Sequence, residues 1–156
     1  MKKTTIAISA ILVCVILLAS CGGPKTAISA EEFKEKAEQA GLTVMDTTII
    51  DLTEDGWFDI ESSCIAKGNN YRIEFSVFST EQQAAAFYNE YKIYIESMKG
   101  SSSSYSDVNL SNYNKYTQTS AGIYSVVSRI DNTVVYASAS ADYKLEINDF
   151  LKDIGY

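Results

Sequence analysis

The residue types in this chain narrow the chemistry it can perform. The sequence contains no histidine, so it cannot form a Ser-His-Asp triad, a Cys-His pair or a histidine-based metal site. Cys64 would need a base or a positive neighbour to lower its pKa before it could act as a nucleophile. It follows Phe58 and Ile60 at alternate positions, and a buried cysteine usually behaves as a small hydrophobic residue. We therefore expect Cys64 to be a core residue, with a reactive thiol as the alternative.

Five carboxylates crowd around one polar turn, and hard cations such as Ca²⁺ prefer clustered oxygen ligands. They are Asp51, Glu54, Asp55, Asp59 and Glu61. The Asp-x-Asp-x-Asp-Gly pattern of a calcium loop is absent, and a glycosidase carboxylate pair would need a sugar cleft that a small domain rarely forms. We expect a solvated acidic surface and assign no metal site. A Ca²⁺ or small-solute site at the acidic turn 51–61 is kept as the alternative.

A third candidate is a stretch rich in serine, tyrosine and asparagine between residues 101 and 120. Rigid amphipathic tyrosines among small polar residues are typical of antibody binding surfaces. Tyr105, Tyr113 and Tyr116 supply the aromatic rings, and Trp57 could join them or stack on a sugar ring. We name these four residues as a candidate binding surface, with a plain polar loop as the alternative.

Hydrophobic periodicity and end signals predict the elements that must position these residues. Ser29 and Glu32 form a capping box at the start of a helix that reaches Ala40 and ends at Gly41. Strands are expected over 42–52, 57–66 and 71–78, then a helix that starts at 79 or 80 and ends before Gly100, and a loop over 101–112. Strands over 113–120, 123–130 and 133–139 and a helix over 141–154 complete the order α-β-β-β-α-β-β-β-α. Because Ile73 and Phe75 alternate with polar residues, we predict an α+β fold with an antiparallel sheet and helices packed on one face.

The first twenty residues read as a targeting segment. Lys2 and Lys3 precede an apolar run that is shorter than the roughly 20 residues a membrane-spanning helix needs. Leu18-Ala19-Ser20-Cys21 then resembles the lipobox of bacterial lipoproteins, and an ordinary signal peptide or uncleaved anchor is the alternative. The resemblance implies cleavage before Cys21 and a diacylglycerol on its sulfur, which would hold the protein at the extracytoplasmic face of a cell membrane. The division expected is a signal peptide over 1–20, a lipidated tether over 21–27 and one domain over 28–156, similar in pattern to small uncharacterised lipoproteins of Gram-positive bacteria.

Charge and composition restrict the partners. The chain has 156 residues, and without Lys2 and Lys3 it carries 11 basic and 20 acidic residues, a formal net charge of −9. Such a surface repels phosphate backbones, so no nucleic-acid partner is expected. No phosphate-binding loop, dinucleotide motif or Cys-x-x-Cys pair is present, and no cofactor is expected. We therefore expect a non-enzymatic, lipid-anchored domain that binds a protein or a component of the cell envelope.

Overall fold

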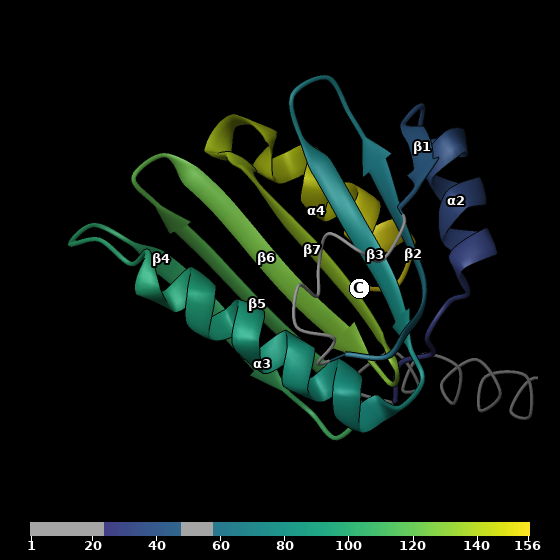
Figure 1. Cartoon of the computed structure of the whole chain (residues 1–156). Coiled ribbons are helices and arrows are strands. Elements are labelled where there is room, and N and C mark those ends of the chain that lie inside the picture. The colour runs from purple at the N-terminus through teal and green to yellow at the C-terminus, as the bar shows by residue number, and fades with distance from the viewer. Residues whose placement is uncertain (1–23, 48–57) are drawn as a thin grey trace, which may run out of the picture.

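The computed structural model describes residues 24–47 and 58–156. Within them, seven strands form one antiparallel sheet in the order β1-β2-β3-β7-β6-β5-β4, drawn in Figure 1. The strands are β1 (Thr43–Asp46), β2 (Ile60–Lys67), β3 (Arg72–Phe78), β4 (Ser104–Asn109), β5 (Tyr113–Ser120), β6 (Ile123–Ile130) and β7 (Thr133–Ser140). The helices are α2 (Ala30–Gln39), α3 (Glu81–Ser97), the 3₁₀ turn η2 (Ala141–Tyr143) and α4 (Lys144–Asp153).

The sheet consists of two meanders that meet at its centre. Strands β1 to β3 form one meander and β4 to β7 form the other, and β3 pairs with β7. Helix α3 connects the central strand β3 to the far edge strand β4. It therefore has to cross the second meander, and it contacts β3, β5, β6 and β7 on the way.

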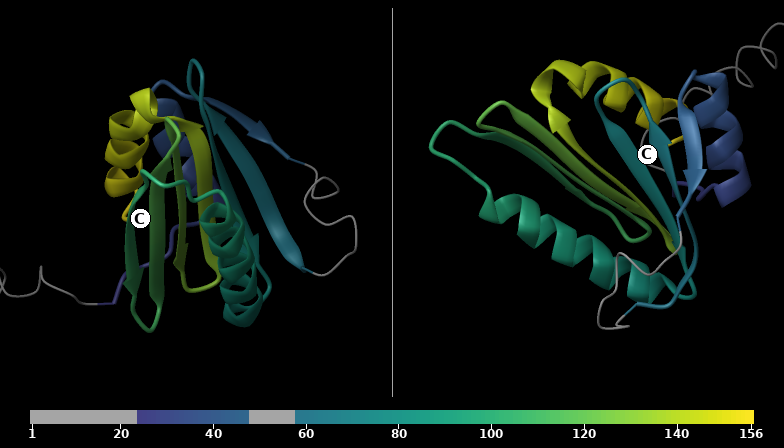
Figure 2. Two further views of the ribbon diagram at one scale, coloured as in Figure 1. Left: turned by 90° about the vertical axis from the view of Figure 1, so that its left-hand side faces the viewer. Right: turned by 45° about the horizontal axis from the view of Figure 1, so that its top comes forward.

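Helices cover both faces of the sheet. Phe33 of α2 and Leu151 of α4 pack with Phe75 in one buried cluster, whereas Phe87 of α3 packs with Val127 in a second cluster. Neighbouring strand residues divide between the two clusters because successive side chains of a strand point to opposite faces. The left panel of Figure 2 shows the sheet between α4 and α3. The α+β class and the antiparallel sheet are confirmed, but the expected placement of all helices on one face is wrong.

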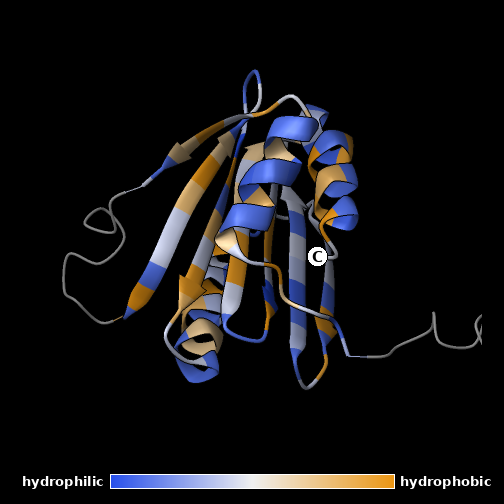
Figure 3. Cartoon of the chain, turned by 90° about the vertical axis from the view of Figure 1, so that its right-hand side faces the viewer, coloured by the Kyte–Doolittle hydropathy of each residue, from blue (hydrophilic) through white to orange (hydrophobic). Residues whose placement is uncertain are grey.

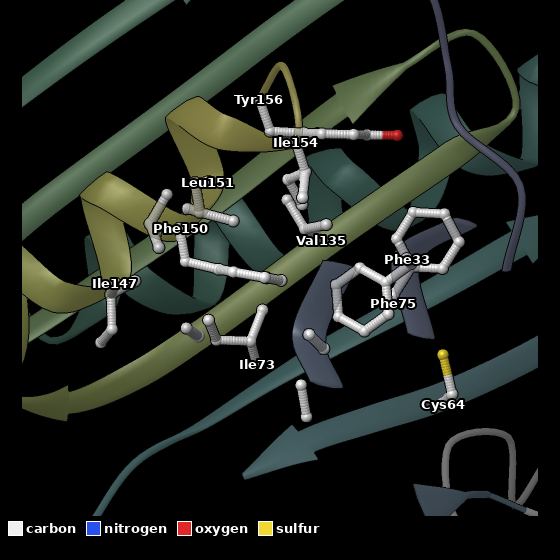
Figure 4. Packing of buried hydrophobic residues seen from close by; sticks show 14 of the residues in the cluster. Phe33, Cys64, Ile73, Phe75, Val135, Ile147, Phe150, Leu151, Ile154 and Tyr156 are labelled. Atoms are coloured by element: carbon white, nitrogen blue, oxygen red, sulfur yellow. The ribbon is translucent and has the colours of Figure 1, made fainter. Parts of the chain in front are cut away.

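The larger cluster lies between the sheet and helices α2 and α4. The rings of Phe33 and Phe75 stack with their centroids 4.7 Å apart, and Phe150 meets Phe33 edge-on at 5.7 Å. Cys64 lies at the margin of this cluster in Figure 4 and is fully buried. Figure 3 shows α2 and α4 with polar residues turned outward, which is the pattern of helices that bury one face.

Helix ends follow the predicted signals. The Ser29 hydroxyl accepts a hydrogen bond from the Glu32 amide at 3.1 Å, and Thr80 caps α3 in the same way through the Gln83 amide. Gly41 and Gly155 adopt positive φ angles of 78° and 91°. At each of these helix ends, the amides of the glycine and of the residue after it donate to carbonyls in the last helical turn. This is the Schellman arrangement, which favours glycine.

Three local expectations about the strands were wrong. Residues 104–109, placed in a loop, form the edge strand β4, which is held mainly by its ladder with β5. A bulge between Ile60 and Ser62 shifts the register of β2, so Ile60 and Cys64 lie in different clusters. The polar face of β3 is not solvated, because Glu74 and Ser76 are buried on the side that α3 covers.

The domain begins earlier than expected. Residues Ala27 and Ile28 pack against the larger cluster, and the Lys25 ammonium donates to the carbonyl of Gly155 at 2.5 Å. Lys25 and Ala27, which belong to the expected lipidated tether over 21–27, therefore contact the domain. Within the described ranges, no helix is long and apolar enough to cross a membrane.

Candidate functional site

Two of the three tyrosines of the predicted binding surface lie together, because the rings of Tyr105 and Tyr116 stack with their centroids 6.2 Å apart. The side chain of Tyr105 is 60% exposed, but Tyr113 is 7% and Tyr116 1% exposed. Tyr113 packs in the larger cluster and Tyr116 in the smaller one, because residues three apart on a strand face opposite sides of the sheet. Trp57 lies outside the described residues. Tyr113 therefore lies on the opposite face of the sheet from Tyr105 and Tyr116, and the three tyrosines do not form a single surface.

The acidic turn is only partly described. Asp51, Glu54 and Asp55 lie outside the described residues. Asp59 precedes β2 and Glu61 lies at its bulge, and both are exposed. Among the described residues, no group of three or more potential metal-ligating side chains comes together. The Ca²⁺ alternative remains a prediction.

Cys64 occupies the core, as expected, although the bulge in β2 places it on the opposite face of the sheet from Ile60. Its side chain is fully buried, and burial raises the pKa of the thiol to about 11. A thiol with such a pKa carries almost no thiolate at neutral pH, so it is a poor nucleophile. Cys21, the predicted lipidation site, lies outside the described residues.

The structure reveals a polar pocket between α3 and the β4–β6 half of the sheet. Its volume is about 520 Å³, within the range of small-molecule sites. We call it the Arg129 pocket. It is lined by Ala85, Tyr88, Asn89, Lys92, Asp107, Asn109, Leu110, Ser111, Asn114 and Arg129. Two cations and one carboxylate thus line this pocket, in a domain whose net charge is strongly negative.

Arg129 is the central charged group of the pocket. Its side chain is 5% exposed, because β6 places it beneath α3 rather than at an edge. Its Nε donates to Asn114 Oδ1 at 2.7 Å, and Nη1 and Nη2 donate to the carbonyls of Asp131 and Ser111 at 2.8 and 3.2 Å. All three acceptors are neutral. None of the ion pairs among the described residues includes Arg129.

A buried guanidinium without a carboxylate is costly, because neutral acceptors replace only part of its hydration. The three hydrogen bonds use three of its five N–H donors. The remaining donors belong to Nη1 and Nη2, the two nitrogens that form a bidentate fork with a carboxylate or a phosphate. An anion bound in the pocket would therefore supply Arg129 with the negative charge that no carboxylate of the described residues supplies.

Neighbouring side chains fix this geometry. Asn114 accepts from Arg129 and donates its amide to Asn109 Oδ1 at 2.5 Å, which sets the orientation of both amides. On the helix side, the Lys92 ammonium pairs with Asp107 Oδ2 at 2.5 Å. The side chains of Lys92 and Asp107 are 25% and 37% exposed, so this pair lies at the rim. Lys92 is a point charge that can turn toward an entering anion.

A second hollow lies on the other flank of α3, but its guanidinium already has a carboxylate partner. It measures about 440 Å³ and includes Tyr91, Tyr136 and the Arg72–Glu74 pair. The Arg72 Nε lies 2.9 Å from Glu74 Oε1. Because this guanidinium has a carboxylate partner and Glu90 adds a second negative charge to the lining, the second hollow does not favour an anion.

Sequence reasoning did not identify the Arg129 pocket. Its residues come from α3, β4, β5 and β6, and only the fold brings them together. One signal was present in the sequence: an arginine between Ser128 and Ile130, inside a strand that carries no other charged residue. A charged residue there must either point to solvent or be buried with partners, and the expected single-sided sheet favoured the first interpretation.

Comparisons with known proteins add a fold likeness. The sequence matches no protein-family model, and no curated protein matches it. Among solved structures, the chain is similar to a protein described as a GTP-binding regulator from Thermotoga maritima. The TM-score is 0.52 with 15% sequence identity, over 85% of this chain and 88% of that one. A likeness at this identity concerns the fold alone.

Proposed function

We propose that this protein is a non-enzymatic, lipid-anchored domain at the extracytoplasmic face of a bacterial cell membrane, and that it binds an envelope component in the Arg129 pocket. The lipobox ending at Cys21 supports the anchor and the location. One observation carries the binding site: the buried guanidinium of Arg129, without a carboxylate partner, lines a pocket of about 520 Å³.

The chemistry of the pocket favours binding over catalysis. Asp107 is the one carboxylate in its lining, and its charge is engaged by Lys92. The other polar groups are amides, a tyrosine and a serine. Burial raises the pKa of Tyr88, so its hydroxyl stays protonated at neutral pH. Such groups orient a ligand through hydrogen bonds, and the cations select for negative charge.

Thermal unfolding with a ligand panel tests this function. The full chain is melted in a non-ionic detergent with phosphate esters, di- and tricarboxylates, cell-wall sugars, CaCl₂ or EDTA. A ligand at about a hundred times its dissociation constant adds about 2.7 kcal/mol of stability, which raises the Tm of a domain of this size by several degrees. We expect an anionic compound to raise the Tm, and Lys92→Gln to reduce that shift.

The matched control is Lys152→Gln. Lys152 is an exposed lysine on α4, across the sheet from the pocket, so its substitution removes one charge without touching the site. A panel in which every anion leaves the Tm unchanged would refute binding at the Arg129 pocket. A shift with CaCl₂ that EDTA reverses would instead support the acidic turn 51–61.

A further inference from the structure

The start of the described chain is fixed to one end of the sheet. The Lys25 ammonium lies 4.2 Å from the centroid of the Tyr113 ring and donates to the carbonyl of Gly155. The carbonyl of Lys25 accepts from Asn112 Nδ2 at 2.7 Å. Both the side chain and the backbone of Lys25 are therefore held by the domain, and Ile28 continues the contact into the core.

The same end of the sheet carries two turns. Asn112 belongs to the connection between β4 and β5, and its Nδ2 also donates to Asp131 Oδ1 at 3.1 Å. Asp131 begins the turn between β6 and β7, and its amide donates to the carbonyl of Asn112 at 3.0 Å. The site where Lys25 is held and the two turns thus form one connected corner.

The Arg129 pocket borders this corner on the face of the sheet that α3 covers, opposite to the face that carries the Tyr113 ring. Arg129 donates to the carbonyls of Ser111 and Asp131, one in each turn. Leu110 also lines the pocket, and its side chain is 48% exposed. Only Asn112 and Asp131 separate the guanidinium from the backbone of Lys25 along this chain of hydrogen bonds.

Covalent geometry limits how far this corner can lie from a lipid anchor. Lys25 is four positions after Cys21, and an extended chain spans at most about 3.6 Å per residue. The Lys25 end of the domain therefore stays within about 14 Å of a lipidated Cys21. Two acyl chains on Cys21 hold it at the membrane surface, where the phosphates of lipid headgroups lie.

From this placement we infer that the Arg129 pocket binds a phosphate ester, namely the headgroup phosphate of an anionic phospholipid in the membrane that holds the protein. This inference rests on the proposed function, because it requires both the anchor at Cys21 and binding in this pocket. Nη1 and Nη2 of Arg129 supply a fork for two phosphate oxygens, and Lys92 supplies a second positive charge.

Binding a headgroup would also orient the domain. The net charge of −9 that the chain carries without Lys2 and Lys3 repels an anionic membrane surface, so the acyl chains alone leave the domain free to turn away. A headgroup in the Arg129 pocket holds this corner against the bilayer and directs the opposite end of the sheet, with the β2–β3 hairpin, away from it.

The test uses the full lipidated chain in non-ionic detergent micelles, which contain no phosphate. One arm adds phosphatidylglycerol to the micelles, a second adds inorganic phosphate or glycerol phosphate, and a third adds succinate as a non-phosphate anion. The variants are Arg129→Lys, Lys92→Gln and the control Lys152→Gln, with the Tm as the readout. Circular dichroism checks that each variant is folded. If Arg129→Lys does not fold, Lys92→Gln still tests the pocket, because Lys92 lies at the rim.

We expect phosphatidylglycerol to raise the Tm by several degrees in the wild type and in Lys152→Gln. Losing one charge-assisted contact in Lys92→Gln should weaken the apparent affinity about tenfold or more. Soluble phosphates that shift the Tm as strongly as the lipid would overturn the headgroup assignment. A shift with succinate alone would overturn the phosphate inference and leave the proposed function standing, whereas no shift in any arm or in the wider panel would overturn both.

Discussion

The stacked pair Phe33–Phe75 should carry a large share of the stability of the core. Phe75 is fully buried. Besides its stack on Phe33, it meets Tyr156 edge-on with centroids 6.3 Å apart. Phe75→Ala removes the whole ring and leaves a cavity, which costs about 3–5 kcal/mol. Phe75→Leu retains most of the volume and loses mainly the two ring contacts. Because each aromatic pair contributes about 0.5–1.5 kcal/mol beyond its buried area, we expect Phe75→Leu to cost about 1–3 kcal/mol.

The assay is urea unfolding of the full chain in non-ionic detergent, followed by circular dichroism. Ile93→Ala is the matched control, because Ile93 is 65% exposed on α3 and should change stability by no more than about 0.5 kcal/mol. A double-mutant cycle with Phe33→Leu isolates the stack, and we expect a coupling of about 0.5–1.5 kcal/mol. A near-neutral Phe75→Ala, or a coupling near zero, would refute the assignment of this face of β3 to the core.

Three further outcomes are expected from single changes. Cys21→Ala should abolish lipidation, so that metabolic labelling with a fatty acid disappears, and persistent labelling would contradict the lipobox. Cys64 should resist a thiol reagent at pH 8 until urea unfolds the chain, because burial raises the pKa of its thiol to about 11; stoichiometric modification of the native protein would contradict its burial. Burial also raises the pKa of the Glu74 carboxyl, and this effect is larger than the lowering by Arg72. The protonated carboxyl therefore favours the native state, and the protein loses this stability as the pH rises through the pKa of Glu74 in the folded state. In urea melts, Glu74→Gln should therefore be more stable than the wild type at pH 7, and its advantage in free energy of unfolding should be smaller near pH 4.5. A wild type that is more stable than Glu74→Gln at pH 7 would contradict the raised pKa of Glu74.

Three strands of the second meander, β5 to β7, could be predicted almost to the residue. Strands β5 and β6 match their expected bounds, and β7 extends one residue further. Their limits are set by two-residue turns in which Ala121, Gly122 and Asp131 have positive φ angles, a geometry that glycine and aspartate signal in the sequence. Local pattern was sufficient here because each strand is bounded by a turn with its own conformational preference.

Edge strands and buried polar positions could not be predicted in this way. The residues of β4 are mostly exposed, so hydrophobic alternation gives no signal for a strand that exists through its ladder with β5. Ser63 and Ser76 are buried and hydrogen-bond to each other across β2 and β3 at 3.2 Å. From the sequence alone, serines at alternate positions of a strand indicate a solvent-exposed face. Only the path of α3 across the sheet shows that this face is covered.

The prediction that Tyr113 and Tyr116 share one surface was wrong for a reason that the sequence already contained. Tyr113 and Tyr116 are three residues apart on one strand, and period-two alternation assigns them to opposite faces. Within the described residues, the charged pocket that replaces them depends on Lys92 and Arg129, 37 positions apart in the numbering. No local pattern connects two such residues before the fold is known.

The most direct test of the binding site is arginine side-chain NMR. Arg72 and Arg129 are the two arginines of the chain, so a spectrum of the Nε–Hε groups contains one reporter inside the pocket and one outside it. In a titration of the ¹⁵N-labelled full chain in detergent with glycerol phosphate or short-chain phosphatidylglycerol, we predict that the Arg129 signal shifts and saturates while the Arg72 signal does not. Signals that both stay in place, or that both drift without saturating, would contradict anion binding at Arg129.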